Sequence, residues 1–463
     1  MSSFHILNLY EESDSSKRMG YMKIKLWTCV ITVIIAAVML RYYAMDYGKQ
    51  QQTIAEDVVP IIGVLIKNDD FMGDFHECLK ITGTGGFYRE VNGKREVYPA
   101  GRVITEKRDV SGDATEENLD EAVIYGSCDD SGELVICNLK RSEEQPSYRG
   151  ILKITSAEKG YLVINELPLE EYLPAVVSSE MSASFPEEAL KAQAVCARTY
   201  AVKRMQEHTD RYYGAILDDS MENQVYNNIH SDAVTKQAVE DTAGMILMEE
   251  DTPADIYYYS TSCGVTGEDL FDNEDNFSQF LRQGREDDLE KEEAWYRWNA
   301  SVSPDEIYEN LKKMNVEPPG QVLKLNILER TQSGQVTALQ IEGTDGSVRM
   351  NGEYEIRQAL ATKSIVLQDG SNCSSLNLLP SAWFVIDDEY ADDETEKKED
   401  DLENTVFLLT GGGFGHGNGM SQNGAKCMAL AGNTWQEILE AYYPEFQIKN
   451  MQRIENIEGK ETD

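Results

Sequence analysis

The segment from Leu167 to Met205 constrains the fold of this chain most, because it encodes two helices separated by a break. Pro174 suits the first turn of a short helix, where its missing N–H is not needed, and that helix would run to Glu180. Ser184 and Glu187 have the spacing of a capping box, which predicts the start of a second helix. Small and apolar residues recur along this second helix at near-helical spacing, so we expect it to be buried on one face.

Glu180 would lie where the two helices meet, a position from which a rigid scaffold can present a side chain to a cleft. Isolated glutamates are mostly exposed and act as capping or solvated residues. Spacing alone therefore leaves two interpretations of Glu180 open, a functional carboxylate and an ordinary surface residue.

The chain as a whole is strongly acidic, which limits its partners. It has 463 residues, a formal net charge of −40 and a pI near 4.4. A surface that binds nucleic acid has to be basic, so the composition argues against nucleic acid as a partner, and also against adhesion to anionic lipid. The length predicts two or three folding units with room for a core.

Residues 23–45 are predicted to form a transmembrane anchor. An uncharged run from Leu26 to Leu40 follows two lysines, and aromatic residues lie near both of its ends. A cleaved signal peptide is the alternative, but Arg41 and two tyrosines follow the run where a cleavage site would need small residues. By the positive-inside rule, the tail of residues 1–22 stays cytoplasmic and the C-terminal region lies outside the cell membrane.

Beyond the anchor, the pattern is that of an α+β protein with mixed strands and helices. The expected parts are a stalk (46–57), a strand-rich part (58–149), a larger region that carries the helix pair (150–450) and a tail (451–463). Residues 387–404 have almost no apolar side chains, which predicts a solvated, disordered insertion.

Within the larger region, turn residues and periodicity predict individual elements. Two strands about a Lys-Gly turn should precede Leu167, and an amphipathic helix should run from Asp232 to near Gly244. A further helix is expected over 303–314 and hairpin strands over 322–350.

Eight cysteines leave the question of disulfides open. Cys29 lies in the apolar run, and the other seven form an odd set, so at least one stays unpaired within the chain. Cys128 and Cys137 flank an expected hairpin and are the pair to test first. The alternative is that most cysteines are small buried apolar residues.

Three motifs follow one another in the sequence: SSEMSASFPEEALKAQAVCARTYA, which contains Glu180, then YYYSTSCGVTGE from Tyr257, and GGGFGHGNGMSQNGAKCMAL from Gly411. In this order they resemble the motifs of the SpoIID/LytB family of bacterial peptidoglycan lytic transglycosylases. Three ordered motifs over roughly 280 residues are far more specific than one short pattern. The chain departs from the family at Ser182, where proline is usual, and at Cys263, where glycine is usual.

The resemblance implies that Glu180 is the catalytic acid. Hydrolytic glycosidases usually need two carboxylates, whereas a lytic transglycosylase can use one and closes a 1,6-anhydro ring on N-acetylmuramic acid. Such an acid needs a raised pKa, which burial beside apolar groups would provide, and Phe185 and Tyr259 are expected to supply that wall. No cofactor or metal is needed.

Six further residues are expected to bind substrate: Arg198, Tyr259, Ser260, Ser262, His416 and Gln422. For each group the sequence leaves an alternative open. Arg198 could instead pair with a carboxylate inside the fold, and Tyr259 could be an ordinary core residue. The two serines could merely close a turn. His416, on a glycine-rich loop, could bind substrate, orient Glu180 or stabilise the loop.

Some family members carry a structural zinc site in the region that follows the second helix. Here His208 and His230 have no cysteine partners, which falls short of four zinc ligands, so we expect no metal. The expected partners are peptidoglycan glycan strands and an amidase of the cell wall. Two other functions stay open, a non-catalytic glycan-binding enhancer of such an amidase and an anchored scaffold for other factors.

Overall fold

The computed structural model describes residues 60–451 except for 70, 72, 108–121, 142–143, 208–212, 222, 229–231, 266–270, 272, 375 and 388–405. The chain divides into two units, residues 1–60 and 61–463, and Pro60 is the one described residue of the first. The predicted tail, anchor and stalk lie outside the described residues, as does nearly all of the acidic insertion and of the C-terminal tail. In the described part of the chain, no helix is both long and apolar enough to cross a membrane.

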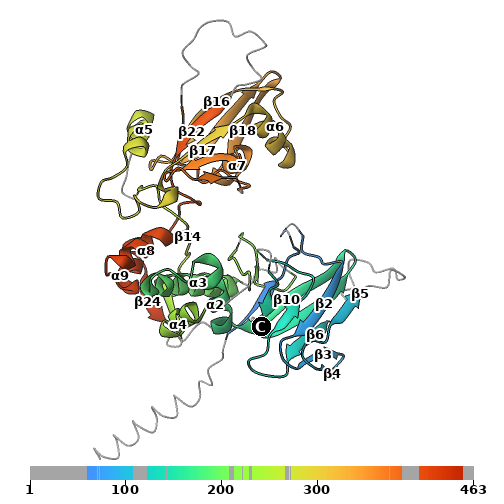
Figure 1. Cartoon of the computed structure of the whole chain (residues 1–463). Coiled ribbons are helices and arrows are strands. Elements are labelled where there is room, and N and C mark those ends of the chain that lie inside the picture. Colours follow the sequence, from blue (N-terminus) through green and yellow to red (C-terminus); the bar gives the residue numbers. More distant parts are fainter. Residues whose placement is uncertain are drawn as a thin grey trace, which may run out of the picture. The chain divides into compact units, whose positions relative to one another are not determined.

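The described residues form a mixed α+β fold, as predicted (Figure 1). One sheet has the strand order β11-β1-β10-β9-β6-β3-β4, and the hairpin about the Lys-Gly turn is β9 and β10. A second sheet has the order β5-β2-β7-β8. The strands are β1 (Ile61–Leu65), β2 (Cys78–Gly83), β3 (Phe87–Val91), β4 (Lys94–Tyr98), β5 (Ile104–Lys107), β6 (Val123–Ser127), β7 (Leu134–Ile136), β8 (Ser147–Tyr148), β9 (Ile151–Ala157), β10 (Gly160–Pro168) and β11 (Leu217–Asp218).

The helix pair follows β10 directly, and its boundaries differ from the prediction. The first helix, α2 (Leu169–Glu180), begins five residues before Pro174 and carries this proline inside it. The second, α3 (Glu187–Glu207), begins at Glu187 itself, so the predicted capping box at Ser184 is wrong. Ser184 instead belongs to the turn between the helices, which the side chain of Ser182 closes through bonds to Ser184.

The second helix, α3, is buried on more than the one face that we predicted. Nearly every residue between Ala189 and Val202 is buried. Among the described elements, six pack closely around α3: α2, α4 (Ala233–Asp241), β12 (Met245–Glu249), β13 (Thr252–Pro253), α8 (Gln422–Leu430) and α9 (Trp435–Tyr442). Its alanines allow these neighbours to approach closely, because a methyl group takes little room between packed elements.

The segment from Asp232 to Leu247 combines a helix and a strand. The helix α4 is capped by the side chain of Asp232 and ends at Asp241. The strand β12 starts at Met245 and pairs with β13 (Thr252–Pro253) and β24 (Gln447–Asn450). The predicted helix is therefore confirmed, although it ends three residues before Gly244 and a turn leads from it to β12.

A further group of elements has a core of its own, centred on Trp298. The strand orders are β20-β19-β15-β22-β21 and β16-β17-β18, and α6 and α7 pack against the second of these sheets (Figure 1). A capping box of Ser303 and Glu306 starts α6. The elements are α5 (Glu274–Gln283), a 3-10 turn (Ala294–Tyr296), β15 (Trp298–Val302), α6 (Pro304–Lys313), β16 (Val322–Arg330), β17 (Val336–Gly343), β18 (Gly346–Asn351), α7 (Glu353–Ala359), β19 (Ser364–Leu367), β20 (Asn372–Cys373), β21 (Phe384–Ile386) and β22 (Phe407–Gly411).

Two short strands complete the fold and matter most for the site. The strand β14 (Tyr258–Tyr259) pairs in parallel with β23 (Met420–Ser421), so Tyr258 lies opposite Met420 and Tyr259 opposite Ser421. This two-stranded ribbon brings the second and third sequence motifs together.

All seven described cysteines are free thiols. Cys128 is exposed and Cys137 is partly buried, and they form no disulfide. Cys196 and Cys263 are buried, as expected for small apolar residues.

Candidate active site

Glu180 is the last residue of α2, and its carboxylate is the meeting point of three separate segments. The backbone N–H of Val225 donates to Oε1 of Glu180 at 2.8 Å. The phenol of Tyr258 donates to the same oxygen at 3.4 Å, and the side chain of Gln422 also hydrogen-bonds to this carboxylate. The carboxylate is therefore held by a loop amide, a strand side chain and a helix side chain.

The environment of Glu180 favours the protonated acid. Desolvation by the surrounding protein raises the pKa of Glu180 to about 7, and the bonds from Val225, Tyr258 and Gln422 oppose this shift only in part. A carboxylic acid with a pKa near 7 can donate a proton at neutral pH and take it back as a base.

Behind Glu180, a chain of buried side chains fixes the phenol of Tyr258. The amide of Gln224 donates from Nε2 to Tyr258 at 3.2 Å, and the phenol of Tyr172 donates to Oε1 of Gln224 at 3.1 Å. Burial raises the pKa of Tyr258 and of Tyr172 well above the usual range, so both phenols stay protonated donors.

The ribbon of β14 and β23 separates two environments. Successive side chains of a strand point to opposite faces, so Tyr258 points toward Glu180 while Tyr259 points away. Tyr259 lies near Glu290 and hydrogen-bonds with Ser262. The predicted apolar wall is thus wrong in one residue, because the tyrosine that contacts Glu180 is Tyr258. Phe185 packs against the main core, with Lys426 over its ring at 5.3 Å.

His416 joins the glycine-rich loop to β14. Its Nδ1 accepts from the backbone N–H of Asn418 at 3.1 Å, so its Nε2 carries the proton that is donated to the carbonyl of Tyr258 at 3.0 Å. Burial lowers the pKa of His416, in agreement with a neutral ring. Of the three predicted roles, these bonds account for stabilisation of the loop.

The serines of the second motif make bonds within the fold. Ser262 accepts from the N–H of Gly264 at 3.0 Å through its hydroxyl, which closes the turn. The hydroxyl of Ser260 bonds to Thr261 at 3.1 Å, and its carbonyl accepts from the N–H of Asn423 at 2.9 Å. Both residues are partly exposed, so their hydroxyls remain candidates for contact with sugar.

Arg198 belongs to the fold and not to a binding surface. Its side chain is fully buried and forms two hydrogen bonds to the carboxylate of Glu170, at 2.7 and 2.8 Å. It also donates to the carbonyls of Met245 and Val239. The alternative given by the sequence, an ion pair inside the fold, describes Arg198, and we assign it no role in substrate binding.

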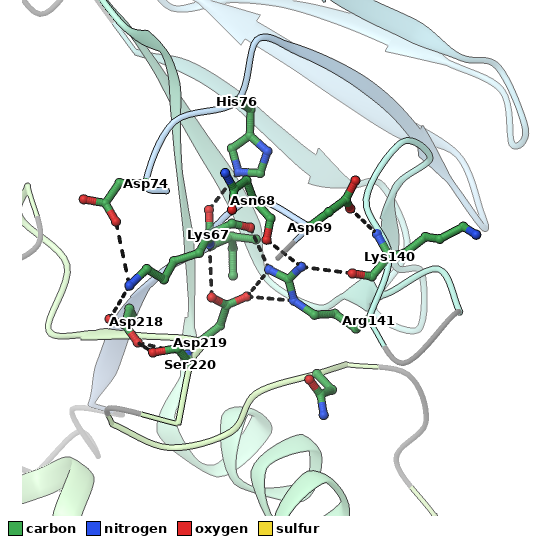
Figure 2. Close-up of polar contacts among 12 residues, drawn as sticks. Lys67, Asn68, Asp69, Asp74, His76, Lys140, Arg141, Asp218, Asp219 and Ser220 are labelled. Atoms are coloured by element: carbon green, nitrogen blue, oxygen red, sulfur yellow. Dashed lines mark hydrogen bonds and ion pairs between the residues drawn. The ribbon is translucent and has the colours of Figure 1, made fainter. Parts of the chain in front are cut away.

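The loop that carries Val225 is fixed by a buried ion pair. Figure 2 shows Arg141 and Asp219 pointing toward each other, with Nη2 of Arg141 at 2.6 Å from Oδ2 of Asp219. Both side chains are fully buried, and Oδ1 of Asp219 accepts from the N–H of Lys67 at 3.0 Å. The carbonyl of Asp219 then accepts from the N–H of Tyr226, directly after Val225.

The same region is where relatives were expected to bind zinc. In Figure 2 the ammonium of Lys67 lies between the carboxylates of Asp218 and Asp74, at 3.5 and 3.9 Å. Across the described ranges, no group of three or more His, Cys, Asp or Glu side chains could hold a metal ion. His208 and His230 lie outside those ranges.

Three residues of the site were missed from the sequence: Tyr258, Val225 and Glu290. Tyr258 stood in a run of tyrosines whose faces could not be told apart, and Val225 contributes only its backbone. Glu290 is 4% exposed, and burial raises its pKa to about 7. Its sequence context, a run of charged residues, resembles a solvated loop.

Comparison with family models matches the first of the three motifs to a named family. Residues 157–248, which include α2, α3 and Glu180, match the SpoIID family, described as stage II sporulation protein. Residues 251–419 match a domain of unknown function.

The curated relatives extend the similarity over about 60% of the chain. Stage II sporulation protein D of Bacillus subtilis is 29% identical over 301 residues, which cover 62% of this chain and 75% of that protein. The amidase enhancer of Bacillus subtilis is 26% identical over 302 residues, 59% of this chain and 39% of that protein. Residues 157–248, which carry the helix pair that presents Glu180, therefore belong to the SpoIID family.

Proposed function

We propose that this chain is a peptidoglycan lytic transglycosylase that cleaves the glycan strand after N-acetylmuramic acid, with Glu180 as its acid and base. The observation that carries the proposal is the carboxyl of Glu180, whose pKa is raised to about 7 where all three family motifs meet. The similarity to stage II sporulation protein D supports a role in sporulation.

The proposed reaction needs one carboxyl group. Protonated Glu180 donates its proton to the glycosidic oxygen, and the bond from that oxygen to C1 of the muramic acid breaks. The C6 hydroxyl of the same sugar attacks C1, and its proton passes to the carboxylate of Glu180. The products are a free 4-hydroxyl on one strand, a 1,6-anhydro end on the other and a regenerated acid.

The geometry around Glu180 fits both halves of this cycle. Desolvation keeps the acid protonated for the first step. The donors Val225, Tyr258 and Gln422 stabilise the carboxylate that exists between the two steps. Ser260, Ser262 and Tyr259 are proposed to lie along the bound glycan, since they are partly exposed on the motif that contains Tyr258.

The proposed setting is the outer face of the cell membrane. Residues 23–45 would anchor the chain with its N-terminus in the cytoplasm, and the catalytic region of residues 150–450 would face the wall. An amidase that removes stem peptides is the proposed partner, because a relative is named amidase enhancer.

The alternative is that the chain binds glycan and enhances an amidase without cleaving the strand. The similarity to the amidase enhancer favours this function. Under it, neither the wild type nor a variant of Glu180 would cleave the glycan strand, and both would still bind it.

Mass spectrometry of products from denuded glycan strands distinguishes these functions. The samples are the purified full-length protein, Glu180→Gln, and the matched control Glu309→Gln, whose carboxylate is exposed on α6. We expect anhydro-ended sugars from the wild type and the control, and none from Glu180→Gln. Reducing ends would indicate a hydrolase with a second carboxylate. Retained binding without any cleavage in the three proteins would contradict the transglycosylase and favour the enhancer function.

A further inference from the structure

A second buried carboxylate, that of Glu290, connects two motif segments. It lies in the region that matches a domain of unknown function and is 4% exposed. Its Oε2 accepts two hydrogen bonds, from the backbone N–H of Ser262 at 2.9 Å and from the hydroxyl of Ser421 at 2.6 Å. One oxygen atom thus ties the turn of the second motif to the start of the third.

The contact with Ser421 leads directly to Glu180. The hydroxyl of Ser421 donates to Glu290 and accepts from the N–H of Gly424 at 3.1 Å, which makes it the N-cap of α8. Gln422, the first residue of α8, contacts the carboxylate of Glu180. Since Tyr258 and Tyr259 point to opposite faces of β14, Glu180 and Glu290 lie on opposite faces of the ribbon.

The fit of α8 against Glu290 is close. A Cβ atom at Gly424 would lie 2.6 Å from Oε1 of Glu290 and 1.9 Å from the hydroxyl of Tyr442. Beside it, Lys426 of α8 pairs with Glu293 at 2.6 Å. The titratable and charged groups around Glu290 are therefore Asp288, Glu293, Tyr259, Tyr442, Cys427 and Lys426.

We propose that Glu290 is a positioning residue for the site, which holds Ser262 and Ser421 so that Gln422 bonds to Glu180. This inference rests on the proposed function in one respect, the use of Glu180 as the acid. The proposal gives residues 251–419, which match a domain of unknown function, a role in positioning the site. When Glu290 is ionised, above its pKa of about 7, its bonds with Ser262 and Ser421 are charge-assisted and roughly twice as strong as neutral ones, so a neutral side chain of the same shape should weaken them there.

Hydrogen exchange of the full-length protein tests the contacts without any substrate. In Glu290→Gln we expect faster exchange in peptides that contain Ser262 and Gly424, because both amides depend on Glu290 directly or through Ser421. Peptides of β16–β18, which lie in a different core, should exchange as in the wild type. Unchanged exchange around Ser262 and Gly424 would overturn the proposal.

The pH dependence of cleavage tests whether Glu290 acts through Gln422. The titratable groups that face Glu180 are Tyr258 and Tyr172. Val225 and Gln422 contribute neutral hydrogen-bond donors. Loss of the Gln422 bond should lower the acid dissociation constant of Glu180 by about threefold to tenfold, so the alkaline limb of kcat should move to higher pH. A merely structural role would lower the amount of folded enzyme at every pH and leave the limb in place.

A double-mutant cycle completes the test. We expect Glu290→Gln and Gln422→Ala to lower kcat by similar factors, and the double variant to be no slower than the worse single one. If the two factors multiply, Glu290 does not act through Gln422.

If Glu290→Gln folds poorly, Ser421→Ala replaces it in the test. This variant removes the hydrogen bond between Ser421 and Glu290 and leaves Glu290 in place. Ser303→Ala, which removes an equivalent N-cap from α6, is its control. We expect the alkaline limb of kcat to move to higher pH in Ser421→Ala and to stay in place in Ser303→Ala. The same shift in both variants would overturn the proposal. If the wild type makes no anhydro sugars, the proposed function fails, while the exchange pattern still decides whether Glu290 holds the two segments.

Discussion

The carboxylate of Glu180 accepts a hydrogen bond from the backbone N–H of Val225, 45 positions later in the chain, at 2.8 Å. The loop around Val225 is fixed on both sides of this bond. The N–H of Asn227 donates to the hydroxyl of Ser179 at 3.0 Å, and Asp219 is held by Arg141. The acid is therefore positioned by a loop that carries no recognisable motif.

Tyr258→Phe should raise the pKa of Glu180 further, because the phenol that stabilises the carboxylate is removed. The expected fall in the acid dissociation constant is about twofold to tenfold, the range for one hydrogen bond. The pH profile of kcat measures it as an alkaline limb at higher pH. Tyr98→Phe on β4, whose phenol bonds to Glu96, is the control, and a limb that moves equally in both variants would contradict this assignment.

Glu180→Gln should stabilise the fold above neutral pH. The folded pKa of about 7 exceeds the usual 4.5, so folded protein binds a proton that the unfolded chain has released. The wild type therefore loses stability as pH rises from about 4.5 to 7, and the glutamine variant lacks this loss. Urea unfolding at pH 4.5 and 8 measures the difference. The variant should have a higher free energy of unfolding than the wild type at pH 8 and the same one at pH 4.5. An equal difference between the two proteins at both pH values would refute this prediction.

Arg198→Met should lower stability more than it affects substrate binding. It leaves Glu170 without its partner in a largely buried site, and the expected loss in the free energy of unfolding is about 3 kcal/mol. Arg349→Met, which breaks an exposed pair with Glu329, should cost below about 1 kcal/mol. Chemical denaturation gives both values, and KM for glycan should stay within a factor of two. A raised KM with unchanged stability would return Arg198 to the binding site.

Gly424→Ala should destabilise the protein, although alanine is favoured over glycine in a helix by about 1 kcal/mol. The new methyl group would lie 1.9 Å from the hydroxyl of Tyr442, and such overpacking costs about 1–3 kcal/mol. Tyr442→Phe removes that hydroxyl, so the double variant should recover part of the loss in thermal unfolding. Gly86→Ala, where a Cβ meets only ordinary contacts, is the control. Additive effects of the two changes would argue against a clash at Tyr442.

The sequence predicted local features that depend on neighbouring residues. The β9–β10 hairpin and the helix α6 follow from turn residues and local patterns, and the structure confirms them. The predicted ends of helices differ from the observed ones, since α2 begins before Pro174 and α3 begins at Glu187 without a cap at Ser184. Hydrogen bonds from more distant groups decide where such helices begin and end, and periodicity does not report them.

Ordered motifs and local patterns in the sequence were enough to indicate the resemblance to the SpoIID family, the α+β class and Glu180 as the candidate acid. Tertiary structure alone decided that Tyr258 and not Tyr259 contacts Glu180, that Arg198 is an internal ion pair, and that Glu290 is buried. A strand's alternation reveals two faces but not which one meets the acid. Burial of a charge depends on partners that are far away in the chain, and only the folded arrangement brings them together.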